Sequence, residues 1–378
     1  MIYADHAATT KISETAKLAM LSAMEKDWYN PSSLYTPGQQ ASGTLMDARV
    51  RIAHCLGCLP KEIYFTSGGS EADNQAILSA AAIGKRQGKM HIISTAFEHH
   101  AVLHTLKKLE KEGFEITLLD VGEKGIVSPV QVEKAIRPYT ILVTVMYANN
   151  EIGTIQPIRE IGAICRKNGV LFHTDAVQAA GHLQINVEKD QIDMLSLSAH
   201  KFNGPKGIGV LYAKTGVFLT NLIEGGGQER GKRAGTENLP AIVGMVAALE
   251  EACSLQKERS IYVTKLRDQL IDGLKKIPGA LLNGDATNRL PGNVNFCFPD
   301  TEAEGLLLLL DNKGICASSG SACTSGFLDP SHVLLAIGRD PQTARGSLRL
   351  TLDYENTPEE VETIIEAVTD TVRILRGC

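Results

Sequence analysis

The chain has 378 residues and a formal net charge of −5, and 43% of its residues are hydrophobic and 21% charged. This balance is typical of a water-soluble globular protein of two or more domains, and it gives no reason to expect nucleic acid or an anionic membrane as main partner. The N-terminal residues MIYADHAATT lack a basic region before an apolar stretch, and the apolar run 305–310 is too short to span a bilayer. We therefore expect a cytoplasmic protein.

Short apolar runs alternate with helical patterns between about residues 60 and 215. Strands are predicted at 62–67, 90–95, 116–121, 140–148, 169–175, 194–199 and 207–213. Helices are predicted between them, the clearest at 71–86 and 102–113. This alternation predicts an α/β fold with a mostly parallel seven-stranded sheet covered by helices on both faces.

The pattern changes after about residue 250. A long charged helix is predicted over 252–277, followed by the segment 291–298, a helix, the strand 347–352 and a final helix from Thr357. This order is typical of a smaller α+β domain attached through a helix. We expect a large domain over 15–254 and a small domain formed by 1–14 and 255–378.

Eight cysteines are scattered along the chain, which does not indicate a disulfide framework, so we expect reduced thiols. Cys55 and Cys58 form a single C-x-x-C pair near the end of a predicted helix. A zinc site would need a second pair of ligands, so we interpret these two residues as structural thiols.

Ligands bind at the carboxyl ends of the strands of open parallel sheets, and four such ends carry polar residues. In FTSGGSEADN, residues 65–74, two glycines permit a tight turn and Ser70 can cap the following helix, whose free N–H groups suit a phosphate. Gly-Gly-Ser turns are also common as plain turns.

The other three strand ends carry Asp175 with Gln178, His99, and the group Ser198, His200 and Lys201. Taken singly, Asp175 can be a helix cap, His99 a packed histidine and Lys201 a lysine at the sheet edge. Together with the phosphate-binding turn they are the parts that a pyridoxal phosphate enzyme needs: a lysine that forms a Schiff base, and a carboxylate that keeps the ring nitrogen protonated.

The chain resembles the cysteine desulfurases of the NifS/IscS type, which are class V aminotransferase relatives among the fold-type I pyridoxal phosphate enzymes. The resemblance covers essentially the whole length through motifs in a fixed order: YADHAATT, NPSS, FTSGGSEADN, EHHAVL, NNEIGTIQP, HTDAVQAAG, SAHKFNGPKGIG, GGGQERGKRAGTEN, ASSGSACTSG and SLRLTL. It implies a homodimer that converts L-cysteine to L-alanine with pyridoxal 5′-phosphate.

The resemblance also implies which residues bind the cofactor: Gly69, Ser70, Asn150, Asp175, Gln178, Ser198, His200, Lys201 and Thr236. Of these, Gly69, Ser70, Ser198 and His200 would hold the phosphate. Thr236 would reach the cofactor of the partner subunit.

Around the ring, Lys201 would carry the cofactor covalently and Asp175 would pair with the ring nitrogen, while Gln178 and Asn150 would contact ring substituents. His99 would stack on the ring and shuttle a proton during catalysis.

The resemblance also implies which residue binds the substrate and which accepts the sulfur. Arg349 would bind the substrate carboxylate, with Arg345 as the nearby alternative. Cys323 lies between small residues in ASSGSACTSG, where a thiol has little to pack against, and would take the sulfur as a persulfide. Through that persulfide Cys323 is also the candidate for a transient iron–sulfur ligand.

Two rival functions remain open at this stage. The first is another class V reaction, such as that of a selenocysteine lyase, kynurenine hydrolysis or transamination, which needs no sulfur-accepting thiol. The second is a non-catalytic cofactor-binding protein, which would be expected to lose the lysine, the thiol or the arginine. The sulfur acceptor is also open: an iron–sulfur scaffold, a tRNA-thiolation enzyme, or thiamine or molybdopterin synthesis. Only 29 residues follow Arg349, so we do not expect the longer C-terminal extension by which housekeeping desulfurases dock a scaffold.

Overall fold

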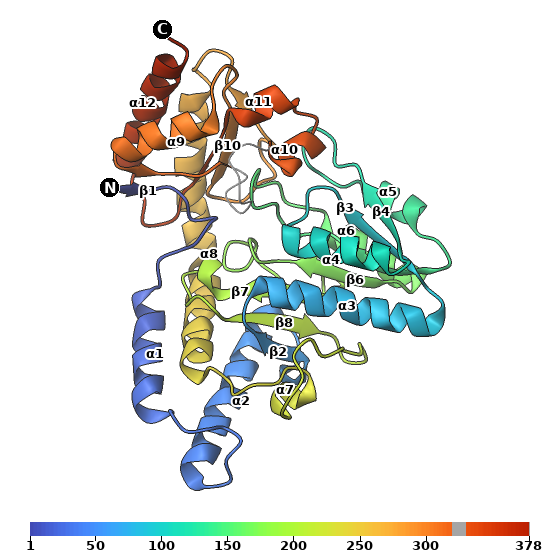
Figure 1. The fold of residues 1–378 in the computed structure, drawn as a ribbon. Helices are drawn as coiled ribbons and strands as arrows, with labels where there is room; N and C mark the ends of the chain where they lie inside the picture. Colours follow the sequence, from blue (N-terminus) through green and yellow to red (C-terminus); the bar gives the residue numbers. More distant parts are fainter. Residues whose placement is uncertain (320–329, 378) are drawn as a thin grey trace.

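The computed structural model describes residues 1–319 and 330–377, and its centre is a seven-stranded sheet with the strand order β2-β8-β7-β6-β5-β3-β4 (Figure 1). The strands are β2 (Ile63–Thr66), β3 (His91–Thr95), β4 (Glu115–Leu119), β5 (Thr140–Thr144), β6 (Leu171–Asp175), β7 (Met194–Ser198) and β8 (Gly209–Ala213). In this sheet β8 is antiparallel to both of its neighbours, β2 and β7, and the remaining pairs are parallel. The predicted mostly parallel sheet is confirmed. The predicted strand 140–148 is too long, because the chain leaves the sheet at Thr144 and bends so that Ala148 bridges Ile155.

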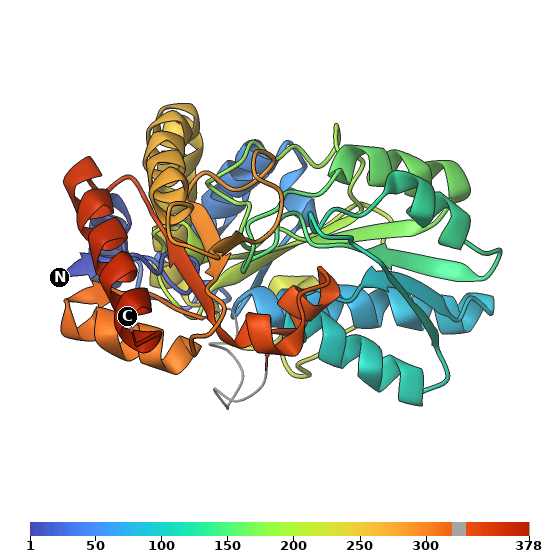
Figure 2. The ribbon, with the colours of Figure 1, turned by 90° about the horizontal axis from the view of Figure 1, so that it is seen from above.

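Helices cover both faces of this sheet, as Figure 2 shows from above. The helices of the sheet region are α2 (Thr36–Leu56), α3 (Gly69–Gln87), α4 (His100–Lys111), α5 (Pro129–Ala135) and α6 (Ile158–Asn168). Every residue of the central strands β3, β5 and β7 is buried, which is the expected consequence of covering a parallel sheet on both sides.

A second set of elements gathers at the other end of the molecule. Its antiparallel sheet has the order β12-β10-β9, and the N-terminal strand β1 pairs with β11. The bounds are β1 (Ile2–Tyr3), β9 (Leu281–Leu282), β10 (Asn293–Cys297), β11 (Ile315–Cys316), β12 (Ser347–Thr351), α9 (Ala303–Asn312), α10 (His332–Ala336), α11 (Pro341–Arg345) and α12 (Pro358–Leu375). Most of these elements share a second hydrophobic core, which includes Ala4 from the N-terminal segment together with Phe296 and Phe298. The helices α10 and α11 instead bury Val333, Leu334 and Ala344 in the core of the seven-stranded sheet. The predicted final helix is confirmed as α12, and Thr357 is its N-cap.

One long helix, α8 (Leu239–Leu274), runs between the two sets of elements (Figure 1). The predicted helix over 252–277 is wrong at both ends. The helix starts 13 residues earlier because Asn238 caps it, Pro240 fits its first turn, and the apolar residues that follow are buried against α1 (Glu14–Lys26) and α2.

Among the described residues, α8 is the one helix long and apolar enough to cross a membrane by length and composition. More than half of its most apolar window is buried inside the protein, so α8 is a core helix. The six described cysteines are free thiols, and Cys55 and Cys58 flank the end of α2 as expected.

Candidate active site

Lys201 ends the short 3-10 helix η2 (Ala199–Lys201), which follows directly from β7. Its Nζ donates hydrogen bonds to the carbonyl oxygens of Ala7 at 2.6 Å and Ala8 at 2.7 Å. The N-terminal segment is held there because both the amide and the hydroxyl of Thr10 donate to the carbonyl of His200. Lys201 is therefore an anchored, half-buried lysine at a strand end and is not part of a solvated surface.

Asp175 and His99 meet beside this lysine, as predicted. One side-chain atom each of Asp175, His99 and Asp73 lie within 4.8 Å of one another. Asp175 ends β6, and its Oδ1 accepts a hydrogen bond from the amide of Val177 at 2.9 Å. In the described chain, turns and no helix follow it directly, so Asp175 is not a helix cap.

The charges of these groups depend on their burial. Burial raises the pKa of Asp175 to about 6, although the Val177 amide and the Lys201 ammonium act in the opposite direction. Burial and the adjacent Asp175 carboxylate raise the pKa of Asp73 well above its usual range. Two neighbouring buried carboxyls of this kind are suited to a cationic N–H group placed beside them.

His99 is the N-cap of α4, and its Nδ1 accepts a hydrogen bond from the amide of Ala101 at 3.1 Å. Burial, followed by the nearby Lys201 charge, lowers the pKa of His99 to about 4. A neutral ring that accepts at Nδ1 carries its proton on Nε2. His99 is therefore a neutral imidazole with one N–H group available to a reacting molecule.

An open cavity of about 460 Å³ lies at the start of α3, next to the lysine. Its lining residues are Ala8, Thr9, Ser67, Gly68, Gly69, Ser70, Glu71, Ser198, His200, Lys206 and Gly207. The four predicted phosphate-binding residues are thus brought together. A Cβ atom at Gly69 would stand 2.6 Å from Cγ2 of Val177, so only glycine permits this close turn. The N-terminus of a 19-residue helix, two hydroxyls and the added charge of Lys206 suit a phosphate group.

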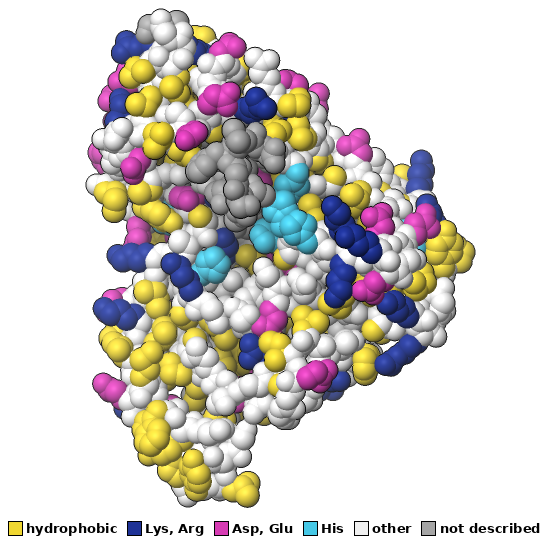
Figure 3. Space-filling view, viewed as in Figure 1, with side chains coloured by type: hydrophobic (Ala, Val, Ile, Leu, Met, Phe, Trp, Pro, Cys, Tyr) yellow, Lys and Arg dark blue, Asp and Glu magenta, His cyan; other side chains and the backbone are white. Residues whose placement is uncertain are grey.

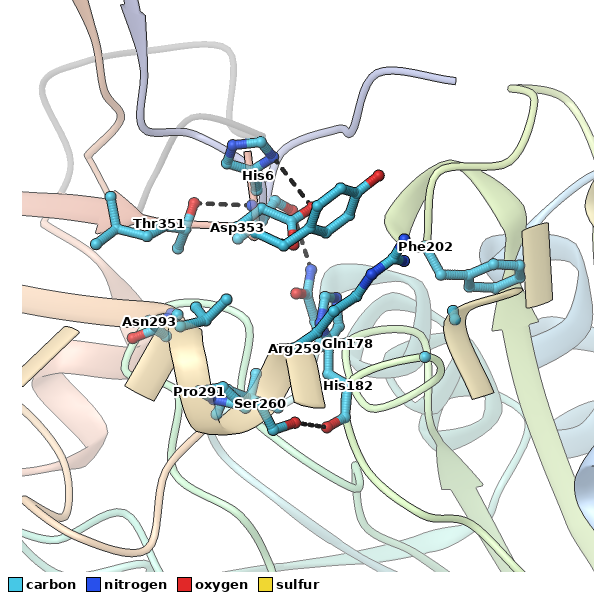
Figure 4. A pocket seen from close by; sticks show the side chains of 18 of the residues that line it. His6, Gln178, His182, Phe202, Arg259, Ser260, Pro291, Asn293, Thr351 and Asp353 are labelled. Carbon is cyan, nitrogen blue, oxygen red and sulfur yellow. Dashed lines mark hydrogen bonds and ion pairs between the residues drawn. The ribbon is translucent and has the colours of Figure 1, made fainter. Parts of the chain in front are cut away.

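Gln178 and Asn150 make contacts that the sequence did not predict. The backbone carbonyl of Asn150 accepts a hydrogen bond from Arg349. The Gln178 amide donates to the Ala7 carbonyl at 3.0 Å, which is the same oxygen that Lys201 contacts. Gln178 also lines a separate small pocket of about 50 Å³ with His6, Phe202 and Asp353 (Figure 4). The predicted contacts of Gln178 and Asn150 with the ring stay predictions.

Arg349 lies on β12 and is only 4% exposed. Its guanidinium pairs with Asp5 Oδ1 at 2.9 Å and donates to the Asn150 carbonyl at 3.1 Å, while its Nε has no hydrogen-bond partner among the described residues. Arg345, the alternative, is exposed at the end of α11. Of the two arginines, Arg349 is the one next to the N-terminal segment that holds the lysine.

One predicted residue of the described part of the chain, Thr236, does not line the cavity at the start of α3. It is exposed and lines a neighbouring cavity with Ser67 and Gly207. Cys323, with its predicted roles as nucleophile and iron–sulfur ligand, lies outside the described residues.

Sequence reasoning missed four polar contributors: Asp5, Asp73, Glu98 and Lys206. The signal for Asp73 was an acid on the alanine-lined buried face of a predicted helix, one turn after Gly69. Glu98 precedes His99 and is fully buried, and burial raises its pKa to about 8.

The fold and this cluster define a class of protein: the Aminotransferase class-V family model matches residues 2–364, so the chain belongs to that family, whose members use pyridoxal 5′-phosphate. Within it, the chain is similar to the cysteine desulfurase IscS of Methanosarcina thermophila, with 52% identity over 100% of this chain and 93% of the relative. It is also similar to the cysteine desulfurase IscS of Clostridium botulinum, with 51% identity over 97% of this chain and 93% of the relative. Among solved structures, a NifS-like protein superposes with a TM-score of 0.92 and 36% identity, covering 99% of both chains. The NifS-like protein of Rickettsia africae superposes with a TM-score of 0.88 and 33% identity, covering 98% of this chain and 99% of that structure. The predicted family, a cysteine desulfurase of the NifS/IscS type, is confirmed.

Proposed function

We infer that the chain is a pyridoxal 5′-phosphate-dependent cysteine desulfurase that converts L-cysteine to L-alanine and transfers the sulfur to an acceptor. The observation that carries this inference is the meeting of Lys201, Asp175 and His99 beside the cavity at Gly69 and Ser70. Identity of about 50% with desulfurases over the whole chain supports the same reaction.

The residues present fit the cofactor. The phosphate would lie in the cavity of Gly69, Ser70, Ser198 and His200, and Lys201 would hold the aldehyde carbon. Asp175 is a buried carboxylate without a full countercharge, which a protonated ring nitrogen would supply. When bound, the cofactor withdraws electrons from the substrate Cα and so weakens the Cβ–S bond.

Side chains of the protein bind the substrate, transfer the protons and accept the sulfur. The Arg349 guanidinium holds the carboxylate of L-cysteine, because it is buried and already arranged for an anionic partner in Asp5. With the amino group of L-cysteine in its place on the aldehyde carbon, Lys201 Nζ would be a free amine and would take the Cα proton as general base. The Cys323 thiolate then attacks the substrate sulfur, so that an S–S bond forms and the Cβ–S bond breaks. The electron pair of the broken bond stays on the carbon skeleton, which takes up a proton through His99 Nε2 and leaves as alanine.

We also propose the division into a large domain, 15–254, that binds the cofactor and a small domain, 1–14 and 255–378, that carries the Cys323 segment. The separate hydrophobic core around Phe296 and Phe298 supports this division. The proposed location is the cytoplasm, which agrees with the buried position of α8.

The proposed assembly is a homodimer in which Thr236 reaches the partner's cofactor. Apolar side chains gather on α1 and on the segment that joins it to α2, at the lower left of Figure 3. These exposed residues are Leu18, Leu21, Met24, Trp28, Leu34 and Tyr35. A patch of this kind on a water-soluble protein supports a protein interface. Light scattering of the purified protein at several concentrations tests the assembly, and a monomer at all concentrations would contradict it.

The reaction is tested by adding L-cysteine to the purified holoenzyme and measuring alanine and protein persulfide in a single turnover. One alanine and one persulfide per active site are expected, and peptide mass spectrometry should locate the persulfide on Cys323. Alanine without persulfide would favour another class V reaction. Capture of persulfide acceptors from host extract then distinguishes an iron–sulfur scaffold from a tRNA-thiolation or cofactor-sulfuration enzyme.

A further inference from the structure

Three histidines gather at the surface where α4 meets α10. His100 and His104 lie one turn apart on α4 with ring centroids separated by 5.1 Å, and the His332 ring centroid is 4.6 Å from that of His100. Figure 3 shows a histidine patch on this face, over the ends of these two helices. The desulfurase mechanism above uses none of the three.

His332 is already held in the form of a metal ligand. Its Nε2 lies 2.9 Å from the carbonyl oxygen of Glu98. Because a carbonyl oxygen only accepts, Nε2 carries the proton and Nδ1 is the nitrogen with a lone pair. Histidines that bind metals almost always donate their other N–H to a carbonyl or a carboxylate, which fixes the ring and raises its basicity.

His100 and His104 add a second element of such a site. Residues four apart on a helix face the same side, and His-x-x-x-His is a spacing found at zinc sites. Burial and the neighbouring imidazoles lower the pKa of His100 to about 4, so its ring is neutral and has a lone pair at neutral pH. His104 is exposed, and rotation of its side chain can bring its nitrogen toward the other two rings.

We propose that His100, His104 and His332 bind a divalent transition-metal ion of the zinc type, with water in the fourth position. The ligand atoms are not yet within bonding geometry of a common point, since among the described residues only Asp73, His99 and Asp175 converge within 4.8 Å. Binding therefore requires a side-chain movement, for which the exposed His104 has room. The ion would link α4, which begins at the active-site residue His99, to α10 of the C-terminal segment.

The test is equilibrium dialysis of the holoenzyme against Zn²⁺, with the bound metal counted by mass spectrometry. Compared with the wild type, His104→Gln, His332→Gln and the double variant should lose one equivalent of metal or bind it at least about tenfold more weakly. His54→Gln is the matched control, because His54 is a histidine near the end of a different helix, α2. It should bind as the wild type does.

The wild type also contains thiols that attract zinc, so the ligands must be identified directly. X-ray absorption of the zinc-loaded wild type should show nitrogen and oxygen scatterers for the equivalent that the variants lose. Unchanged metal binding in the double variant, equal loss in His54→Gln, or sulfur scattering for this equivalent would overturn the proposal. His104 is exposed, so His104→Gln should keep the unfolding temperature of the metal-free protein and remain interpretable if His332→Gln does not fold.

Discussion

Replacing Arg349 with lysine tests how the substrate is held. Arg349 is 4% exposed, with its guanidinium fixed by Asp5 and the Asn150 carbonyl, so it can present two parallel N–H groups to a carboxylate. Lysine keeps the charge but loses one of these two hydrogen bonds. A hydrogen bond to a charged group contributes about 1.5–3 kcal/mol, and each 1.36 kcal/mol is a factor of ten, so Arg349→Lys should lower kcat/KM about 10- to 150-fold.

The assay is alanine formation over a range of L-cysteine concentrations, with cofactor absorbance as the check on folding. Arg345→Lys is the matched control: Arg345 is exposed four residues upstream and should keep kcat/KM within about twofold of the wild type, the range expected for a surface substitution. The reasoning is refuted if Arg349→Lys keeps its kcat/KM with the cofactor bound, or if Arg345→Lys shows the larger loss.

Three further predictions concern the lysine, the thiol and a buried acid. Borohydride reduction should fix the cofactor on the peptide that contains Lys201, whereas Lys201→Ala should show no covalent cofactor mass and no turnover; normal turnover would exclude the lysine. Cys323→Ala should bind the cofactor but form no alanine from cysteine, while Cys253→Ala, which removes the exposed thiol of α8, should keep activity; alanine formation by Cys323→Ala at the wild-type rate would remove this cysteine from the mechanism. Glu98 has a pKa of about 8 in the folded protein and 4.5 as an ordinary side chain. Its ionisation therefore lowers the free energy of unfolding as the pH rises from 4.5 to 8. Glu98→Gln should therefore show a smaller fall of Tm from pH 5 to pH 8, and an unchanged fall would show that Glu98 does not titrate in this range.

The sheet could be predicted from sequence because each strand is a short apolar run bounded by helical patterns. The main error was the start of α8, because no helix was predicted over residues 239–251. Its helical state depends on burial against α1 and α2, which are more than 180 residues away in sequence. The local sequence pattern gives no information about these two packing partners.

The site was predictable where one motif supplies several groups together. The turn at Gly69 and Ser70 and the strand end with Ser198 and His200 each carry several polar groups within a few residues, and the structure brings both to one cavity. The Ala7 and Ala8 carbonyls that hold the lysine could not be predicted, because a backbone carbonyl has no side-chain signature and these lie more than 190 residues from Lys201.

The path of the first eight residues affects how the protein is made. Ile2 pairs with Ile315, the Ala7 amide donates to Thr351 Oγ1 at 2.8 Å, and Asp5 pairs with Arg349. A nascent chain that has emerged from the ribosome only as far as residue 300 contains Lys201 but lacks the partners of all three of these contacts. Assembly of a competent catalytic centre therefore waits for the last fifth of translation.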